Sequence, residues 1–133
     1  MIESNKLIAK RFMQAMGSGD TVTIDSLITD DMIAICTGTS VVSGTRKRDE
    51  VVAAAAIFKQ ITKAGVDFEI LTATAEDDRV ALEMEGHGEM HDGKPYKNQY
   101  HFLFFLRDGK ICKMKEYLDT KLADETVGAL FAK

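Results

Sequence analysis

Two ionisable side chains, His101 and Glu116, lie on neighbouring predicted strands that are otherwise rich in apolar residues. Between these strands stands Asp108-Gly109, a dipeptide typical of two-residue hairpin turns, which would place Arg107 opposite Lys110. Counting outward from that turn sets His101 directly opposite Glu116, with Cα atoms about 5.5 Å apart. An imidazole and a carboxylate sheltered from water can exchange protons with a ligand, so we predict acid/base chemistry by this pair.

A second interpretation stays open for the same pair, because a cross-strand hydrogen bond could simply complete a filled core. His87 and His91 stand near Glu89 and Asp92, but the spacing favours a solvated cluster over a metal site. No motif for a nucleotide, a flavin or a metal is present, so no cofactor is expected.

The alternation of side chains along the hairpin predicts which residues share each face. The inner face should be apolar with few exceptions and should carry Gln99, His101, Leu103, Phe105, Cys112, Met114, Glu116 and Leu118. The outer face should carry an aromatic row beside a lysine row: Tyr100, Phe102, Phe104, Leu106, Ile111, Lys113, Lys115 and Tyr117. A second two-residue turn at Asp92-Gly93 would add Leu82, Met84, Gly86, Gly88 and Met90 to the inner face.

The elements that must position these residues follow from the apolar period. Helical spacing predicts a helix from Ser4 to Met16, a short one beginning after Asp20, and a third from Thr45 to Gly65. Short strands are expected at 32–36 and around Val41-Val42, and a period of two predicts strands over 66–75 and 79–90 before the hairpin. The sequence thus predicts an α+β fold, with three N-terminal helices on one face of a curved mixed or antiparallel sheet.

Length and composition exclude several classes of protein. The 133 residues suffice for one domain, and a net charge of −4 argues against a nucleic-acid surface. No apolar run is long enough for a membrane span, and no signal peptide begins the chain. Cys36 and Cys112 show no disulfide or metal spacing, so we expect a cytoplasmic protein with both thiols reduced.

Several short runs, in this order of elements, together resemble the nuclear transport factor 2-like superfamily, in particular its SnoaL-like and ketosteroid isomerase-like branch. The matching runs are Gly19-Asp20, Asp30-Asp31-Met32, Gly44-Thr45, Asp108-Gly109-Lys110-Ile111 and Glu116-Tyr117-Leu118-Asp119. The resemblance covers nearly all of residues 1–133 and implies a cone-shaped, cystatin-like roll with a pocket between sheet and helices. It also implies a homodimer through the outer sheet face, where Phe102, Phe104, Lys113, Lys115 and Tyr117 are expected.

The branch contains isomerases, epoxide hydrolases, polyketide cyclases and binders. The isomerase positions correspond by resemblance to Phe12, Cys36 and His101, none of which keeps the isomerase residue. The epoxide hydrolase positions correspond to Glu83, Glu85 and Glu116, without the required arginine. The cyclase pattern of a histidine and an acid on the last two strands matches best, through His101 and Glu116.

We therefore expect a pocket protein that binds a small hydrophobic, oxygenated molecule, with His101 and Glu116 catalysing cyclisation, isomerisation or dehydration. The expected ligand-binding residues are Phe12, Met16, Cys36, Met84, Leu103, Met114, Leu118 and Asp119. Two alternatives remain open: a binder or carrier without turnover, and an association module that works through its outer sheet face.

Overall fold

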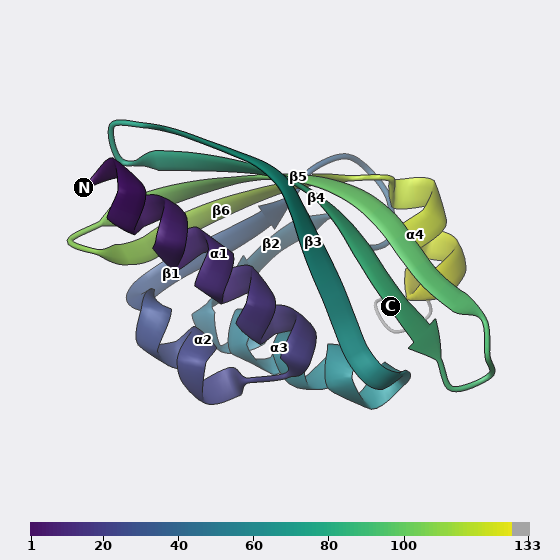
Figure 1. Ribbon diagram of the computed structural model, residues 1–133. Coiled ribbons are helices and arrows are strands. Elements are labelled where there is room, and N and C mark those ends of the chain that lie inside the picture. The colour runs from purple at the N-terminus through teal and green to yellow at the C-terminus, as the bar shows by residue number, and fades with distance from the viewer. Residues whose placement is uncertain (129–133) are drawn as a thin grey trace.

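A computed structural model, which describes residues 1–128, has one curved six-stranded sheet and four helices (Figure 1). The strands are β1 (Ile28–Cys36), β2 (Gly44–Lys47), β3 (Thr62–Glu76), β4 (Arg79–Met90), β5 (Pro95–Arg107) and β6 (Lys110–Leu118). The helices are α1 (Ile2–Ser18), α2 (Thr21–Leu27), α3 (Arg48–Ile61) and α4 (Thr120–Thr126). The α+β prediction is confirmed, and α4 is an additional element that the sequence pattern did not predict.

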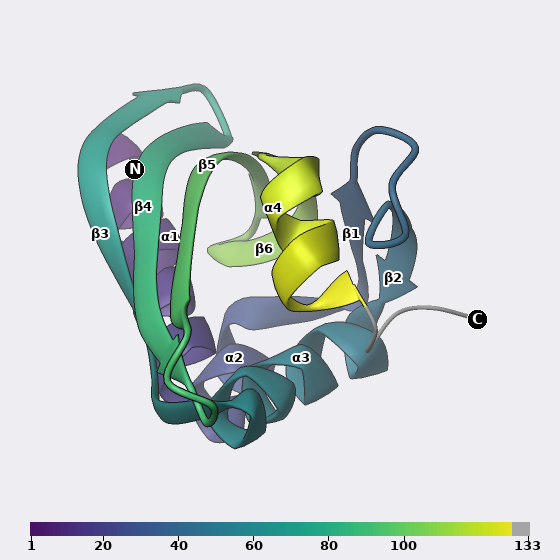
Figure 2. The ribbon, with the colours of Figure 1, turned by 90° about the vertical axis from the view of Figure 1, so that its right-hand side faces the viewer.

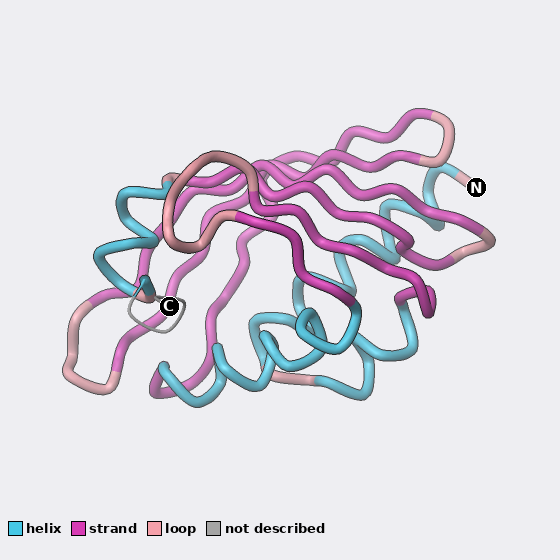
Figure 3. Tube along the Cα trace, turned by 180° about the vertical axis from the view of Figure 1, so that it is seen from behind, coloured by secondary structure: helices cyan, strands magenta, loops and turns pink. Residues whose placement is uncertain are grey.

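The sheet has the order β2-β1-β6-β5-β4-β3 and bends strongly along its length (Figure 2). All neighbouring strands are antiparallel except β1 and β6, which run parallel and join the first strand of the chain to the last. Helices α1, α2 and α3 lie on the concave side, and the view from behind shows the strands passing over them (Figure 3). The predicted curved, mixed sheet with helices on one face is therefore confirmed.

Two helix boundaries differ from the prediction for identifiable reasons. Gly17 does not end α1, which continues to Ser18 and is capped by Gly19 in a left-handed conformation with φ of 76°. Gly17 instead allows close packing on β3, because a Cβ there would lie 1.9 Å from the Val66 carbonyl oxygen. Thr45 does not cap α3, since 44–47 pairs with β1 as β2, and the cap is Lys47 with Glu50.

The predicted pairing of His101 with Glu116 is wrong. The Asp108-Gly109 turn does set Arg107 opposite Lys110, but the register shifts by one residue at Cys112, where β6 has a bulge. Phe105 consequently pairs with Lys113, Phe102 pairs with Glu116, and His101 pairs with Tyr117. Because side chains alternate, one extra residue inverts the face of β5 relative to β6.

The β4–β5 connection also differs from the prediction by one residue. The backbone amide of Met90 donates to the carbonyl of Lys94, which closes a three-residue loop where a two-residue turn was expected. The aromatic residues of β5 therefore join the inner face with β4. Phe102 and Phe104, which were predicted to form an outer interface, are 4% and 0% exposed.

The inner faces of β4, β5 and β6 form the core with the helices. Its largest fully buried side chains include Phe12, Phe104, Met13 and Ile24. Phe12 of α1 packs edge-on against Phe104 of β5, with ring centroids 5.8 Å apart. Among the described residues, no helix has the length and apolar character needed to span a membrane.

Candidate functional site

A cavity of about 100 Å³ lies between the concave sheet face and the helices. Its walls are largely apolar and aromatic, and its polar groups are one carboxyl, one guanidinium, one thiol and two phenols. Six of the predicted site residues line it, namely Phe12, Met16, Cys36, Met114, Glu116 and Leu118. A cavity therefore lies between sheet and helices, where the sequence predicted a pocket.

Glu116 is the acidic residue of this cavity. It lies on β6 between Cys36 of β1 and Phe102 of β5, its Cα partners on the two neighbouring strands. The residue keeps some exposed surface, but its carboxyl group is surrounded by cavity walls. Burial raises the pKa of Glu116 from 4.5 to about 7, while the positive charge of Arg46 opposes the rise. The carboxyl group is thus poised to take up and release a proton near neutral pH.

Two tyrosines on β5 form a hydrogen-bonded pair in the same cavity. Tyr96 and Tyr100 lie four residues apart on the inner face of β5, and their hydroxyl oxygens are 2.5 Å apart. Burial raises the pKa of both phenols, and the negative charge of Glu116 adds to the rise. Both phenols are therefore protonated, and their mutual bond uses one of two hydroxyl hydrogens. The second can be donated to a ligand oxygen.

The thiol and the guanidinium complete the polar set. Burial raises the pKa of Cys36 to about 11, with a further contribution from the charge of Glu116, so the thiol is protonated at neutral pH. Arg46 lies on β2 and donates a hydrogen bond to the carbonyl of Val42 at 2.8 Å. The cavity can therefore recognise a neutral ligand that carries a few oxygen atoms on an apolar body.

Four predicted site residues lie elsewhere. His101 is exposed on the outer face between Glu83 and Tyr117, so it cannot share a ligand with Glu116 across the sheet. Leu103 is half-buried on that same outer face. Met84 is 1% exposed within the core and does not line the cavity. Asp119 is exposed and accepts a hydrogen bond from the backbone amide of Leu122 as the N-cap of α4.

The sequence reasoning missed Tyr96, Tyr100 and Arg46 as site residues. A usable signal was present in β5, where the even positions from Tyr96 to Leu106 are almost all aromatic or aliphatic. The odd positions from Pro95 to Arg107 include lysine, glutamine, histidine and arginine. That alternation alone favours burial of the even positions. No comparable signal marks Arg46, which reaches the cavity from a short strand.

A second, open groove of about 480 Å³ contains His101. Half of its lining residues are exposed polar residues of the outer face, namely Glu83, Gln99, His101, Tyr117 and Asp119. This groove is larger than the inner cavity, but its ionisable groups are open to water. The enclosed cavity around Glu116 is the better candidate for chemistry, since a dry environment strengthens electrostatic interactions.

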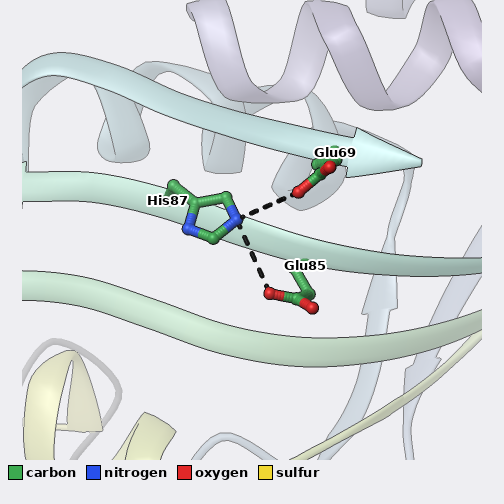
Figure 4. A group of neighbouring side chains, drawn as sticks. All are labelled: Glu69, Glu85 and His87. Atoms are coloured by element: carbon green, nitrogen blue, oxygen red, sulfur yellow. Dashed lines mark ion pairs between the residues drawn. The ribbon is translucent and has the colours of Figure 1, made fainter. Parts of the chain in front are cut away.

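Another cluster of ionisable groups lies on β3 and β4 (Figure 4). The register sets Glu69 directly opposite Glu85, and His87 Nε2 lies 3.4 Å from one carboxylate and 3.7 Å from the other. These oxygen and nitrogen atoms are of the kind that divalent metals bind. All three residues keep exposed surface, and the imidazole lies between two carboxylates that face each other across the strands, as in a solvated surface cluster. His91 lies apart and contacts the Gln60 carbonyl oxygen.

Comparison with solved structures agrees with this architecture. The protein Bal32a from a soil-derived mobile gene cassette superposes with a TM-score of 0.80 at 23% identity, covering 94% of this chain and 97% of that one. A candidate SnoaL-like polyketide cyclase from Jannaschia sp. CCS1 gives 0.78 at 14% identity, covering 96% and 94%. IdmH, a candidate polyketide cyclase from Streptomyces antibioticus, gives 0.76 at 18% identity, covering 93% and 98%. At these identities the similarity establishes the fold.

No curated protein matches the chain in sequence. The family model of the SnoaL-like domain matches residues 9–114, which span α1 through the bulged part of β6 and thus most of the cavity wall. The match agrees with the order of elements, the curved sheet and the cavity between sheet and helices. The chain therefore belongs to the family of SnoaL-like domains.

Proposed function

We propose that the protein binds a small, largely apolar, oxygenated molecule and catalyses proton transfer on it, with Glu116 as the acid/base group. The observation that carries the proposal is a carboxyl group enclosed in an apolar cavity, where burial raises its pKa to about 7. Catalytic carboxyl groups are tuned in this way by burial. Two proteins of similar fold are candidate polyketide cyclases, which is in keeping with a reaction on such a molecule.

The roles of the neighbouring groups follow from their chemistry. The carboxylate of Glu116 would take a proton from a carbon next to a carbonyl group, and the carboxylic acid would return it at another atom. The Tyr96–Tyr100 pair would donate a hydrogen bond to the carbonyl oxygen as negative charge develops there. The apolar walls would exclude water from the intermediate. Isomerisation, cyclisation and dehydration all begin with such a step.

A neutral probe of the base tests this proposal without knowledge of the natural substrate. A nitro-substituted benzisoxazole loses a C–H proton to a base while its N–O bond breaks, and the product is a coloured cyanophenolate. We expect turnover of this probe to fall at least about 100-fold in Glu116→Gln, because general base catalysis contributes about 10²–10⁴-fold. The wild-type rate should rise with pH as a group with a pKa near 7 loses its proton.

The matched control is Glu76→Gln, which neutralises an exposed carboxylate at the end of β3, outside the cavity, and should leave the rate unchanged. Calorimetric titration of the probe separates binding from turnover. If the probe binds and the wild-type rate equals that of Glu116→Gln, the protein is a binder or carrier and the catalytic proposal fails. Equal losses in both variants would also contradict it.

We also propose that the outer sheet face associates with a second copy of the chain. This face has a basic side, with Lys113 and Lys115 on β6, and an acidic side, with Glu83 and Glu85 on β4. A two-fold rotation about an axis near β5 would set each basic side against the acidic side of the other copy. Phe105, half-buried next to Lys113, and the exposed Tyr117 would supply apolar contact between them.

Charge reversal tests this association. Glu83→Lys and Lys115→Glu should each weaken a dimer at least about tenfold in analytical ultracentrifugation. Each substitution brings like charges together, and the two-fold symmetry repeats that contact in the second half of the interface. The double variant Glu83→Lys/Lys115→Glu should restore most of the affinity. Reversal at Glu3 on α1 serves as the control. A wild-type protein that stays monomeric at all concentrations, or a double variant as weak as the singles, would argue against this interface.

A further inference from the structure

Helix α4 forms part of the cavity wall. Its residue Ala123 and the following Val127 are 2% and 6% exposed, and both line the cavity. Figure 2 shows α4 at the open end of the curved sheet, beside the loop between β1 and β2. That loop contributes Val42 to the same wall, and its Val41 lies next to Gly128 just beyond α4. Helix and loop thus meet over the cavity that contains Glu116.

Few interactions within α4 itself can hold it there. The helix has seven residues, and helices of that length do not form stably in water on their own. Ala123 is its one buried residue, whereas Lys121, Leu122, Asp124 and Glu125 are exposed. Its position must therefore be maintained by contacts at its ends.

Asn98 provides such a contact at the N-terminal end. This β5 residue is 2% exposed and is one of the few buried polar side chains of the described core. Its Nδ2 donates to the carbonyl of Asp119 at 3.0 Å, and its Oδ1 accepts from the amide of Asp119 at 3.2 Å. Asp119 is the N-cap of α4, so these two hydrogen bonds fix the residue at which the chain leaves β6 for the helix.

We propose that α4 is a lid over the cavity and that Asn98 is the positioning residue that holds this lid closed. Opening would separate Ala123 and Val127 from the cavity and break both bonds to Asp119. The buried amide would keep only the bond that its Oδ1 accepts from the Gln99 backbone amide at 2.7 Å, and its Nδ2 would have no acceptor, which favours the closed state. The proposal rests on the proposed function only in taking this cavity as the ligand site. Its test measures access to the cavity and does not depend on turnover.

Cys36 reports on opening, because it lines the cavity and is 5% exposed when the lid is closed. In a Cys112→Ser background, alkylation of Cys36 by N-ethylmaleimide is followed by mass spectrometry at constant pH. We expect Asn98→Ala to accelerate the reaction at least about tenfold, since two hydrogen bonds to a buried amide are lost. The reaction should stay slow in the parent protein.

The matched control is Asn5→Ala, which removes another buried asparagine from the first turns of α1, at the opposite end of the molecule from α4 (Figure 1). Equal acceleration in both variants would mean general destabilisation and would overturn the proposal. No acceleration in a folded Asn98→Ala protein would also overturn it. Hydrogen exchange of the parent protein gives a second test: amides of 120–127 should exchange well before those of β5 and β6, and exchange at the same slow rate would contradict a lid.

Discussion

Replacement of Phe104 by alanine is expected to lower the free energy of unfolding by about 3–5 kcal/mol. The side chain is fully buried on the inner face of β5 and packs edge-on against Phe12, with ring centroids 5.8 Å apart. Alanine would leave a cavity between sheet and helix α1 that the rigid strands cannot close. Urea denaturation followed by far-UV circular dichroism measures the change.

Phe105→Ala is the matched control, because it removes the same side chain from the next position on the same strand. Phe105 is half-buried on the outer face, where Lys113 Nζ lies 5.2 Å from its ring centroid. Its loss should cost about 1 kcal/mol, as is usual for substitutions outside the core. A larger loss for Phe105 than for Phe104 would reverse the face assignment of β5 and with it the composition of the cavity.

Glu116→Gln is expected to stabilise the protein by about 2–3 kcal/mol above pH 7 and to have little effect at pH 4. A pKa raised from 4.5 to about 7 corresponds to about 3 kcal/mol, and water near the partly exposed residue reduces this value. Glutamine keeps the size of the side chain and removes the charge, so the cost of ionising a group inside the cavity disappears.

The sign follows from proton binding. Between about pH 4.5 and 7 the folded state keeps the Glu116 proton and the unfolded state has lost it, so stability falls as pH rises. Below pH 4.5 both states are protonated, and above pH 7 the full penalty applies. The test compares unfolding of wild type and variant from pH 4 to 8.5, with Glu76→Gln as an exposed control. A constant difference across this range would argue against a raised pKa.

Most of the architecture could be predicted from local pattern. The spacing of Phe12, Ala15 and Met16 indicates the buried face of α1, and the change to a period of two after Gly65 indicates the meander. Helix α4 could not be predicted, because so short a helix shows almost no periodic spacing of apolar residues. The parallel pairing of β1 with β6 is not encoded locally either, since it depends on how the sheet closes around the helices.

The candidate site could be predicted only in part. The prediction of Glu116 and Met114 on the cavity side agrees with the structure because β6 keeps its inner face beyond the bulge, whereas Cys36 of β1 was expected there from the family resemblance. His101 was misplaced, since its face depends on counting residues through a turn, and the extra residue at Cys112 cannot be seen in the sequence. Tyr96 and Tyr100 were not predicted as cavity residues for the same reason, because the count assigned the even positions of β5 to the outer face. A pair of catalytic residues predicted on two neighbouring strands should therefore be checked against the alternation of apolar and polar residues along each strand separately.

The parallel contact between β1 and β6 also bears on when the site can form during folding. The Thr37 hydroxyl donates to the Glu116 carbonyl at 3.0 Å, and these residues are 79 positions apart in the chain. The ribosome therefore completes one side of the cavity wall long before the other. Contacts of such high sequence separation are made late, because a long loop must first be closed. A nascent chain that has not yet released β6 from the ribosome would contain helices α1, α2 and α3 and most of the meander, yet it would have no binding cavity.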